Sequence, residues 1–288
     1  MMSRNTKRHK PEKKGACTMK KIAIALLGVL WMAGSALADI LLPYTPETYL
    51  DKAKDIQVRL INLTADCTVI KTGQVESFFA LHKRGDSEVT RIDLKERLKE
   101  IPWKNPTGTV ASYAAILSKD ELQKLGDYVL CIIPACTLYK EEDCYIQQIT
   151  KLIVNRGGIP GNWDEPASLP CEILPLSKPY GLWTGNVFHG QVLSEGKPVP
   201  HAEVEVEYLS HIPNLRGNTM NRKGNTVFPN IVLKTQTIVT DSRGYFAYGI
   251  PKAGWWGFAA LGIGPQKKHE EKDLFQDAVI WVQALDMR

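Results

Sequence analysis

The chain has 288 residues, of which 44% are hydrophobic and 23% charged, an ordinary globular composition that can supply one or two apolar cores. Its formal charge of +5 is concentrated at the N-terminus, because residues 1–38 contain eight Lys or Arg and one Glu. The rest of the chain carries 28 basic and 30 acidic residues, and this balance argues against nucleic acid as a partner.

The N-terminal segment has the three parts of an export signal. A basic pair, Lys20-Lys21, precedes an apolar stretch over residues 22–32 and a small-residue cleavage motif that ends at Ala38. We expect residues 1–38 to be a Sec-type signal peptide with an extended basic region, cleaved after Ala38, so that the mature protein is periplasmic. No later apolar run reaches the roughly 20 residues of a membrane-spanning helix.

Five cysteines follow the predicted cleavage site, and disulfides persist in an oxidising compartment. Because five is an odd number, at most two bridges can form. Cys136 and Cys144 are near enough in sequence to close a hairpin, and Cys131 could reach Cys171 or Cys67, so the spacing leaves the pairing open. No Cys-x-x-Cys motif is present, which disfavours a zinc site.

The first half of the mature chain consists of short β-type runs separated by turn residues, a texture typical of β-sandwiches. Two brief helices are expected as connectors, the first capped by Asp93 and the second beginning with the capping-box pair Ser118 and Glu121. The expected strands cover residues 57–63, 76–82, 87–92 and 128–133, and the expected helices cover residues 94–99 and 118–125.

The texture changes between residues 155 and 180, where three Gly and five Pro indicate a connection between modules. We therefore divide the mature chain into an N-terminal module over residues 39–174, a linker over residues 175–184 and a C-terminal module over residues 185–288.

The C-terminal module has the clearest strand pattern. Residues 202–208 alternate strictly, with Ala202, Val204, Val206 and Tyr208 on one face and Glu203, Glu205 and Glu207 on the other. Such a strand has a buried face and a wet face, and the glutamates could either attract a divalent cation or form a solvated outer face, the preferred interpretation. Residues 237–240 and 245–248 predict a hairpin around the turn at 241–244, and residues 278–282 predict a closing strand.

Three segments of the second half together resemble a known family. The runs Glu172–Leu182, Gly185–Gly190 and Pro251–Leu261, the last containing Trp255-Trp256, resemble the DUF4198 family, whose members are exported and often encoded beside nickel and cobalt permeases. Gly190–Val192, Gly196–Val206 and Thr240–Phe246 resemble carboxypeptidase-regulatory or transthyretin-like sandwiches. The expected fold is therefore all-β, with two immunoglobulin-like or transthyretin-like β-sandwich modules after the signal peptide.

The N-terminal module departs from the family pattern at its histidines. Family members have a His near the mature N-terminus, but Asp39 begins a leader without one, and no His occurs from there to Leu81. Glu142-Asp143 and Thr150-Lys151 match family pairs, whereas Gln148 stands where a family His falls. Imidazole is a donor that nickel and cobalt favour, so these replacements weaken the case for a family-type metal site.

Few side chains qualify as metal ligands. His189 points away from the buried face of its predicted strand, His201 lies in a turn beside Pro200, and the acidic pair Glu142 and Asp143 could ligate a hard cation if it lies in a loop. We take these four residues as the candidate metal ligands. No pair of histidines has the spacing of a local metal motif. The Trp255-Trp256 pair could be a recognition surface, although one indole packed into the core is the preferred interpretation.

No catalytic motif is found: the chain lacks a Gly-x-Ser-x-Gly elbow, a His-Glu-x-x-His motif and a phosphate loop. We expect a non-enzymatic protein without a resident cofactor. The family resemblance implies a periplasmic accessory or solute-binding component of a nickel or cobalt uptake system, with Ni²⁺ or Co²⁺ as the transported ligand and an energy-coupling-factor-type permease as the partner. The alternative is an envelope adhesion or scaffold protein that binds a protein or glycan without a metal role.

Overall fold

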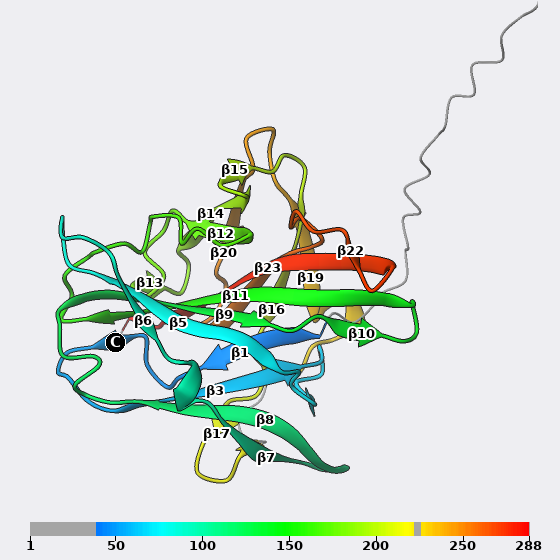
Figure 1. The fold of residues 1–288 in the computed structure, drawn as a ribbon, viewed down its shortest axis with the longest axis horizontal. Helices are drawn as coiled ribbons and strands as arrows, with labels where there is room; N and C mark the ends of the chain where they lie inside the picture. The colour runs from blue at the N-terminus through cyan, green and yellow to red at the C-terminus, as the bar shows by residue number, and fades with distance from the viewer. Residues whose placement is uncertain (1–38, 222–225, 288) are drawn as a thin grey trace, which may run out of the picture. The chain divides into compact units, whose positions relative to one another are not determined.

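The computed structural model describes residues 39–221 and 226–287, and three β-sheets make up most of it (Figure 1). Helical structure in these residues is limited to two single turns of 3-10 helix, η1 (Lys95–Arg97) and η2 (Ile231–Leu233). The prediction of an all-β sandwich fold is therefore confirmed. No helix in the described ranges is long and apolar enough to cross a membrane.

The large sheet has the order β19-β16-β21-β23-β11-β9-β5-β6, with four short strands pairing from its sides. Its strands are β2 (Tyr49–Leu50), β5 (Val75–Lys83), β6 (Thr90–Asp93), β9 (Gly126–Pro134), β10 (Thr137–Tyr139), β11 (Cys144–Arg156), β13 (Leu182–Trp183), β16 (Glu203–Tyr208), β19 (Thr235–Val239), β21 (Gly254–Ala260), β22 (Lys268–His269) and β23 (Lys272–Leu285).

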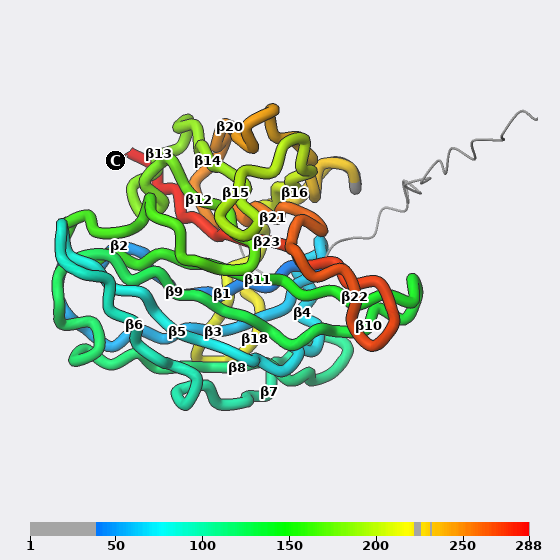
Figure 2. Tube along the Cα trace, turned by 45° about the horizontal axis from the view of Figure 1, so that its top comes forward, coloured from blue at the N-terminus to red at the C-terminus, as the bar shows by residue number. Residues whose placement is uncertain are grey.

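Two smaller sheets cover the two faces of the large sheet (Figures 1 and 2). The first contains β1 (Ile40–Tyr44), β3 (Ile56–Leu63), β4 (Val69–Ile70), β7 (Lys99–Asn105), β8 (Gly108–Leu117), β17 (Pro213–Asn214) and β18 (Thr219–Met220). The second contains β12 (Cys171–Pro175), β14 (Val187–Ser194), β15 (Lys197–Pro198) and β20 (Tyr245–Gly249).

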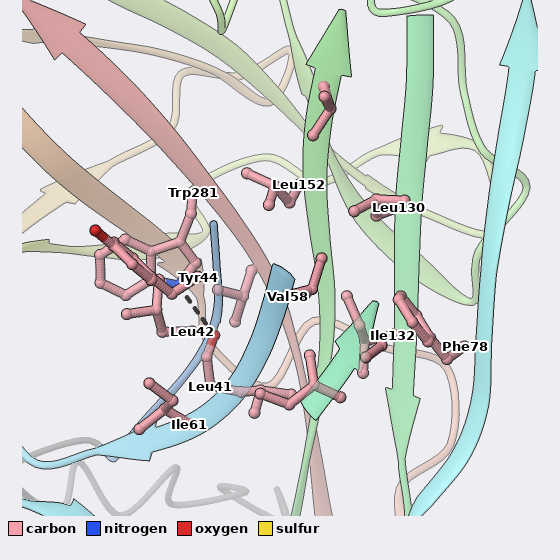
Figure 3. Packing of buried hydrophobic residues seen from close by; sticks show 14 of the residues in the cluster. Leu41, Leu42, Tyr44, Val58, Ile61, Phe78, Leu130, Ile132, Leu152 and Trp281 are labelled. Carbon is pink, nitrogen blue, oxygen red and sulfur yellow. Dashed lines mark hydrogen bonds between the residues drawn. The ribbon is translucent and has the colours of Figure 1, made fainter. Parts of the chain in front are cut away.

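Each face of the large sheet has its own apolar core because side chains alternate along a strand. Val279 and Trp281 of β23 enter the first core, toward β1 and β3, whereas Ile280 enters the second core, toward β12 and β14. Figure 3 shows the first core, where Leu42, Val58 and Trp281 pack together. The large sheet is thus covered on both sides.

The tandem tryptophans follow the same alternation. Trp255 packs in the first core against Tyr44, and Trp256 packs in the second core against Tyr208. Both indoles are buried, at 2% and 5% exposure, where the sequence predicted one. The pair is therefore part of the cores and offers no recognition surface.

Residues from both predicted modules contribute to the large sheet. Tyr145–Leu152 of β11 pairs in parallel with Leu274–Trp281 of β23, which joins the 39–174 and 185–288 segments at the centre of the sheet. The predicted linker, residues 175–184, contains the last residue of β12 and all of β13.

The strands expected around residues 57–63, 76–82, 128–133 and 278–282 are all present, but two local expectations are wrong. The expected helices are reduced to η1 and to a turn at Ser118, where the capping-box bonds to Glu121 form without a helix. The turn at residues 241–244 forms, yet β19 pairs with β16 and β20 pairs with β14, so the turn links two sheets instead of closing a hairpin.

The expectation of disulfides is not met, because all five cysteines in the described ranges are free thiols. The register of β10 and β11 places Tyr139 opposite Cys144, which leaves Cys136 three positions further along. Three positions correspond to about 10 Å along a strand, beyond the roughly 7 Å over which a disulfide joins two Cα atoms.

Candidate functional site

The structure disperses the four metal ligands that the sequence suggested. His189 is exposed on β14, with its ring Nδ1 3.3 Å from Ser177 Oγ, and His201 is exposed in a turn with a left-handed φ of 55°. Glu142 and Asp143 lie in the turn before β11, where Asp143 pairs with Lys272. Within residues 39–221 and 226–287, no three His, Cys, Asp or Glu side chains are grouped to hold a metal ion.

The glutamates of β16 lie on the first-core side of the large sheet, and their burial increases along the strand. Glu203 is exposed, Glu205 is partly buried and Glu207 is only 6% exposed, while Val204 and Val206 fill the second core. The predicted alternation is thus confirmed, but the face expected to be wet lies toward the first core. Glu207 Oε1 accepts a hydrogen bond of 3.2 Å from Thr235 Oγ1, and Glu205 Oε2 is buried without a partner.

A fourth carboxylate, Asp277 of β23, lies on the same face of the sheet. It is 5% exposed, and Oδ1 accepts a hydrogen bond of 2.7 Å from the backbone N–H of Gly262. Its neighbour across the β11–β23 pairing is Gln148, whose side chain also bonds to it. Gln148 in turn donates a hydrogen bond of 2.6 Å to the carbonyl oxygen of Asp39, so Asp277 is linked to the beginning of β1.

We call this region the acidic end and define it as Asp39, Glu203, Glu205, Glu207 and Asp277. Burial raises the pKa of Glu205 to about 7, with a further contribution from Glu203, and the pKa of Glu207 to about 8, with a further contribution from Glu205. Burial likewise raises the pKa of Asp277 to about 7. None of the five residues forms an ion pair with a basic side chain in the part of the chain that the structure describes.

A polar chain adjoins the acidic end near Glu207. Cys67 Sγ lies 3.2 Å from Ser210 Oγ, which lies 2.8 Å from Nδ1 of His211. Burial raises the pKa of the Cys67 thiol, and the nearby Glu207 raises it further, so Cys67 is held as a neutral thiol. This electrostatic setting disfavours a nucleophilic thiolate and leaves the carboxylates as the chemically distinctive groups.

Buried carboxylates without a cationic partner have two ways to avoid the cost of a desolvated charge. They can take up protons, which the raised pKa values of Glu205, Glu207 and Asp277 express, or they can bind a cation. Both responses involve the same oxygen atoms, so protons and a cation would compete for the acidic end. A separate, open recess of about 510 Å³ is lined by both basic and acidic side chains, among them Lys54, Asp55 and Arg216. Because its charges are mixed, it does not share the purely acidic character of the acidic end.

Comparison with protein families gives a match over most of the chain. The model of DUF4198, a domain of unknown function, matches residues 41–264. The chain belongs to the DUF4198 family. The matched range includes β1, β11 and β16, so the DUF4198 domain spans both halves of the large sheet, including the first half, where the sequence showed few family motifs.

The DUF4198 chain matches none of the curated proteins with which it was compared. Among solved structures it is similar to the D0-D1 domain of intimin (12% identity, 83% of this chain and 96% of that one, TM-score 0.20). It is also similar to the Yersinia pseudotuberculosis adhesin InvE (11% identity, 85% and 58%, TM-score 0.24) and to the mouse nectin-like molecule 4 ectodomain (7% identity, 86% and 65%, TM-score 0.20). The chain spans less than two thirds of these last two, and TM-scores of this size support no conclusion about function.

The sequence contained a partial signal for the acidic end. The glutamate alternation in β16 pointed to three of its members, but Asp39 and Asp277 were missed, because one precedes β1 and the other lies in β23, far away in the sequence. Gln148 was noticed only as the replacement of a family His, and its side chain proves to connect both missed residues. Contacts between distant strands, and not spacing along the chain, assemble the acidic end, of which Asp39 and Asp277 lie outside the family match over residues 41–264.

Proposed function

We propose that this DUF4198 protein is a non-enzymatic, periplasmic component of a nickel or cobalt uptake system that binds the divalent cation at its acidic end. The observation that carries the proposal is the absence, in the described residues, of a basic partner for Glu205, Glu207 and Asp277. Buried charges are normally paired or bind metals, so unpaired buried carboxylates favour a cation as their partner.

A cation at the acidic end would require rotation of the side chains, because no three His, Cys, Asp or Glu side chains of the described residues are already grouped around a metal position. Glu205 and Glu207 are two positions apart on one face of β16, a separation of about 7 Å between Cα atoms. Cation binding would draw their oxygens inward and displace the protons that burial favours. Carboxylate oxygens completed by water suit a cation that is held for transfer rather than kept permanently, because the fully nitrogen- or sulfur-ligated sites of late divalent metals bind more tightly.

Export and delivery complete the proposal. Cleavage after Ala38 would release the protein into the periplasm, where it would pass the cation to an energy-coupling-factor-type permease in the membrane. The family membership supports this assignment through the transporter association that the resemblance implies. The lack of catalytic motifs in the sequence supports a binding role without an enzymatic step.

Calorimetric titration of the mature protein with Ni²⁺ and Co²⁺ tests the proposal. We expect submillimolar binding at pH 8 that weakens at least tenfold at pH 6, because protons occupy carboxyl groups whose pKa values lie near 7 and 8. The double variant Glu205→Gln/Glu207→Gln should lose this binding.

Glu142→Gln is the matched control, because it removes one exposed carboxylate that the sequence had suggested as a ligand. This variant should bind as the wild type does. If the wild type gives no binding signal up to millimolar metal, the result would contradict the metal role and favour the adhesion or scaffold alternative.

A further inference from the structure

Strand β3 contains a buried positive charge. Its Arg59 lies between Tyr44 of β1 and Ala114 of β8 in the pairing of the sheet, so the backbone at this position is held from both sides. The residue is only 8% exposed. Because a guanidinium does not lose its proton in proteins, Arg59 carries a full charge into this part of the structure.

The hydrogen bonds of the Arg59 guanidinium go to neutral acceptors. Nη2 donates to Oε1 of Gln57 and to the backbone oxygen of Leu215, each at 3.2 Å. Nε is buried and has no hydrogen-bond partner among the described residues. Burial lowers the pKa of the guanidinium, and no described carboxylate counteracts this effect. Since buried charges are normally paired, the charge of Arg59 is only partly compensated.

Both acceptors of Arg59 line the open recess of about 510 Å³. This volume lies within the range of about 300–1,000 Å³ that is usual for small-molecule sites. Thr45 belongs to the same wall, and its Oγ1 is likewise buried without a partner. Nearly all buried polar atoms in proteins are hydrogen-bonded, so two exceptions beside one recess favour a polar ligand there.

The charged side chains around the recess show which kind of ligand it favours. Glu47 pairs with Lys54 at 2.6 Å, and Asp55 Oδ1 accepts a backbone N–H at 2.7 Å. Arg216, exposed in the wall, and Arg59 form no ion pair in the part of the chain that the structure describes. The fork of a guanidinium matches a carboxylate, whereas the two acidic side chains would repel a doubly charged phosphate.

We propose that this recess binds a small organic carboxylate, whose oxygen replaces the Gln57 amide oxygen as the acceptor of Arg59 Nη2. Gln57 is exposed, so its side chain can rotate aside, while Arg59 stays bonded to the backbone of Leu215. Arg216 then contacts the ligand from the rim. The recess shares no residue with the acidic end, so this inference goes beyond the proposed function and does not depend on it.

Ligand-observed NMR titration of the metal-free mature protein with lactate tests the proposal. Lactamide is the matched probe, because it has nearly the same shape without the charge. We expect saturable binding of lactate in the millimolar range, and binding of lactamide and of inorganic phosphate that is about tenfold weaker or less. Lack of saturable lactate binding, or equal binding of lactate and either of the other probes, would overturn the proposal.

Two substitutions at the exposed Gln57 should act in opposite directions. Gln57→Glu places a carboxylate beside Arg59 Nη2, so it should abolish lactate binding and raise the Tm of the protein. Gln57→Ala removes the competing amide oxygen, and it should tighten lactate binding several-fold. Undiminished binding in Gln57→Glu, or weaker binding in Gln57→Ala, would contradict the exchange of acceptors on which the proposal rests.

Arg59→Lys keeps the charge but loses the fork, and it should weaken lactate binding about tenfold or more. Arg243→Lys is the matched control, because Arg243 is exposed in the turn at residues 241–244, and this variant should bind lactate as the wild type does. Equal binding in both lysine variants would overturn the role of Arg59. The Gln57 variants keep the proposal testable if Arg59→Lys does not fold.

Discussion

The two faces of the large sheet treat buried charge differently. On the second-core face, Lys151 Nζ donates to Glu172 Oε2 at 2.5 Å, and both side chains are at most 2% exposed. On the first-core face, Glu205, Glu207 and Asp277 have no such partner in the described residues. A paired charge holds two sheets together, whereas unpaired carboxylates keep the capacity to bind something else. The contrast separates a structural use of buried charge from the unpaired carboxylates on which the proposed cation site rests.

Breaking the buried Lys151–Glu172 pair should have the largest effect on the free energy of unfolding. Lys151→Met keeps the length of the side chain but leaves Glu172 buried without its cation, and removing one partner of a buried pair costs about 3–5 kcal/mol. Urea unfolding at pH 7 should show this loss of unfolding free energy. The double variant Lys151→Met/Glu172→Gln should recover much of it, and an unrecovered loss would show that packing of the lysine stem, not charge, is what the pair provides.

Neutralising an unpaired carboxylate should raise the free energy of unfolding, and by less than breaking the Lys151–Glu172 pair lowers it. The carboxyl of Glu207 has a pKa raised to about 8, so the folded state holds more protons than the unfolded state between about pH 4.5 and 8, and stability falls as the pH rises through this range. Glu207→Gln removes this decline and should add on the order of 2 kcal/mol at pH 9.

Thermal or urea unfolding at pH 5 and pH 9 measures the effect of Glu207→Gln. At pH 5 the two proteins should differ little, because the wild-type carboxyl is then already protonated. A destabilised variant at pH 9 would show that Glu207 has a cationic partner, and the contrast between the two faces would fail.

The smallest effect is expected for a surface pair. Asp143 and Lys272 form an ion pair with the carboxylate largely exposed, and exposed pairs contribute about 0–1 kcal/mol. Asp143→Asn should therefore change the unfolding free energy by less than about 0.5 kcal/mol and leave nickel binding unaltered. A loss of binding would return the metal site to the acidic pair suggested by the sequence.

The local sequence pattern was enough to predict where the strands lie, but not which strands pair with one another. Runs of β-type residues between turn residues placed β3 and β5 within one or two residues, and strict alternation placed β16 equally well, because a strand with one buried face has period two. The turn at residues 241–244 was also predicted, yet the divergence of β19 and β20 into different sheets depends on long-range pairing. Local chemistry defines the turn, whereas the two strands that flank it join different sheets, because β19 pairs with β16 and β20 pairs with β14.

The candidate site was harder to predict for the same reason. A search guided by histidines led to His189 and His201, which lie apart at the surface. Glu205 was among the residues considered, but a charged face of a strand is usually solvated, and only the first core, which includes the paired residue Ala259, reverses that expectation. The disulfide expectation failed because compartment and cysteine count carry no information about register.

The central position of β23 has a consequence for how the chain matures. Residues 272–285 lie between β11 and β21, so the large sheet stays in two pieces until β23 has been synthesised and paired with both. Contacts of such long sequence separation form slowly. The large sheet can therefore close only late, and loss of β23 would separate β11 from β21 and leave both cores open between them.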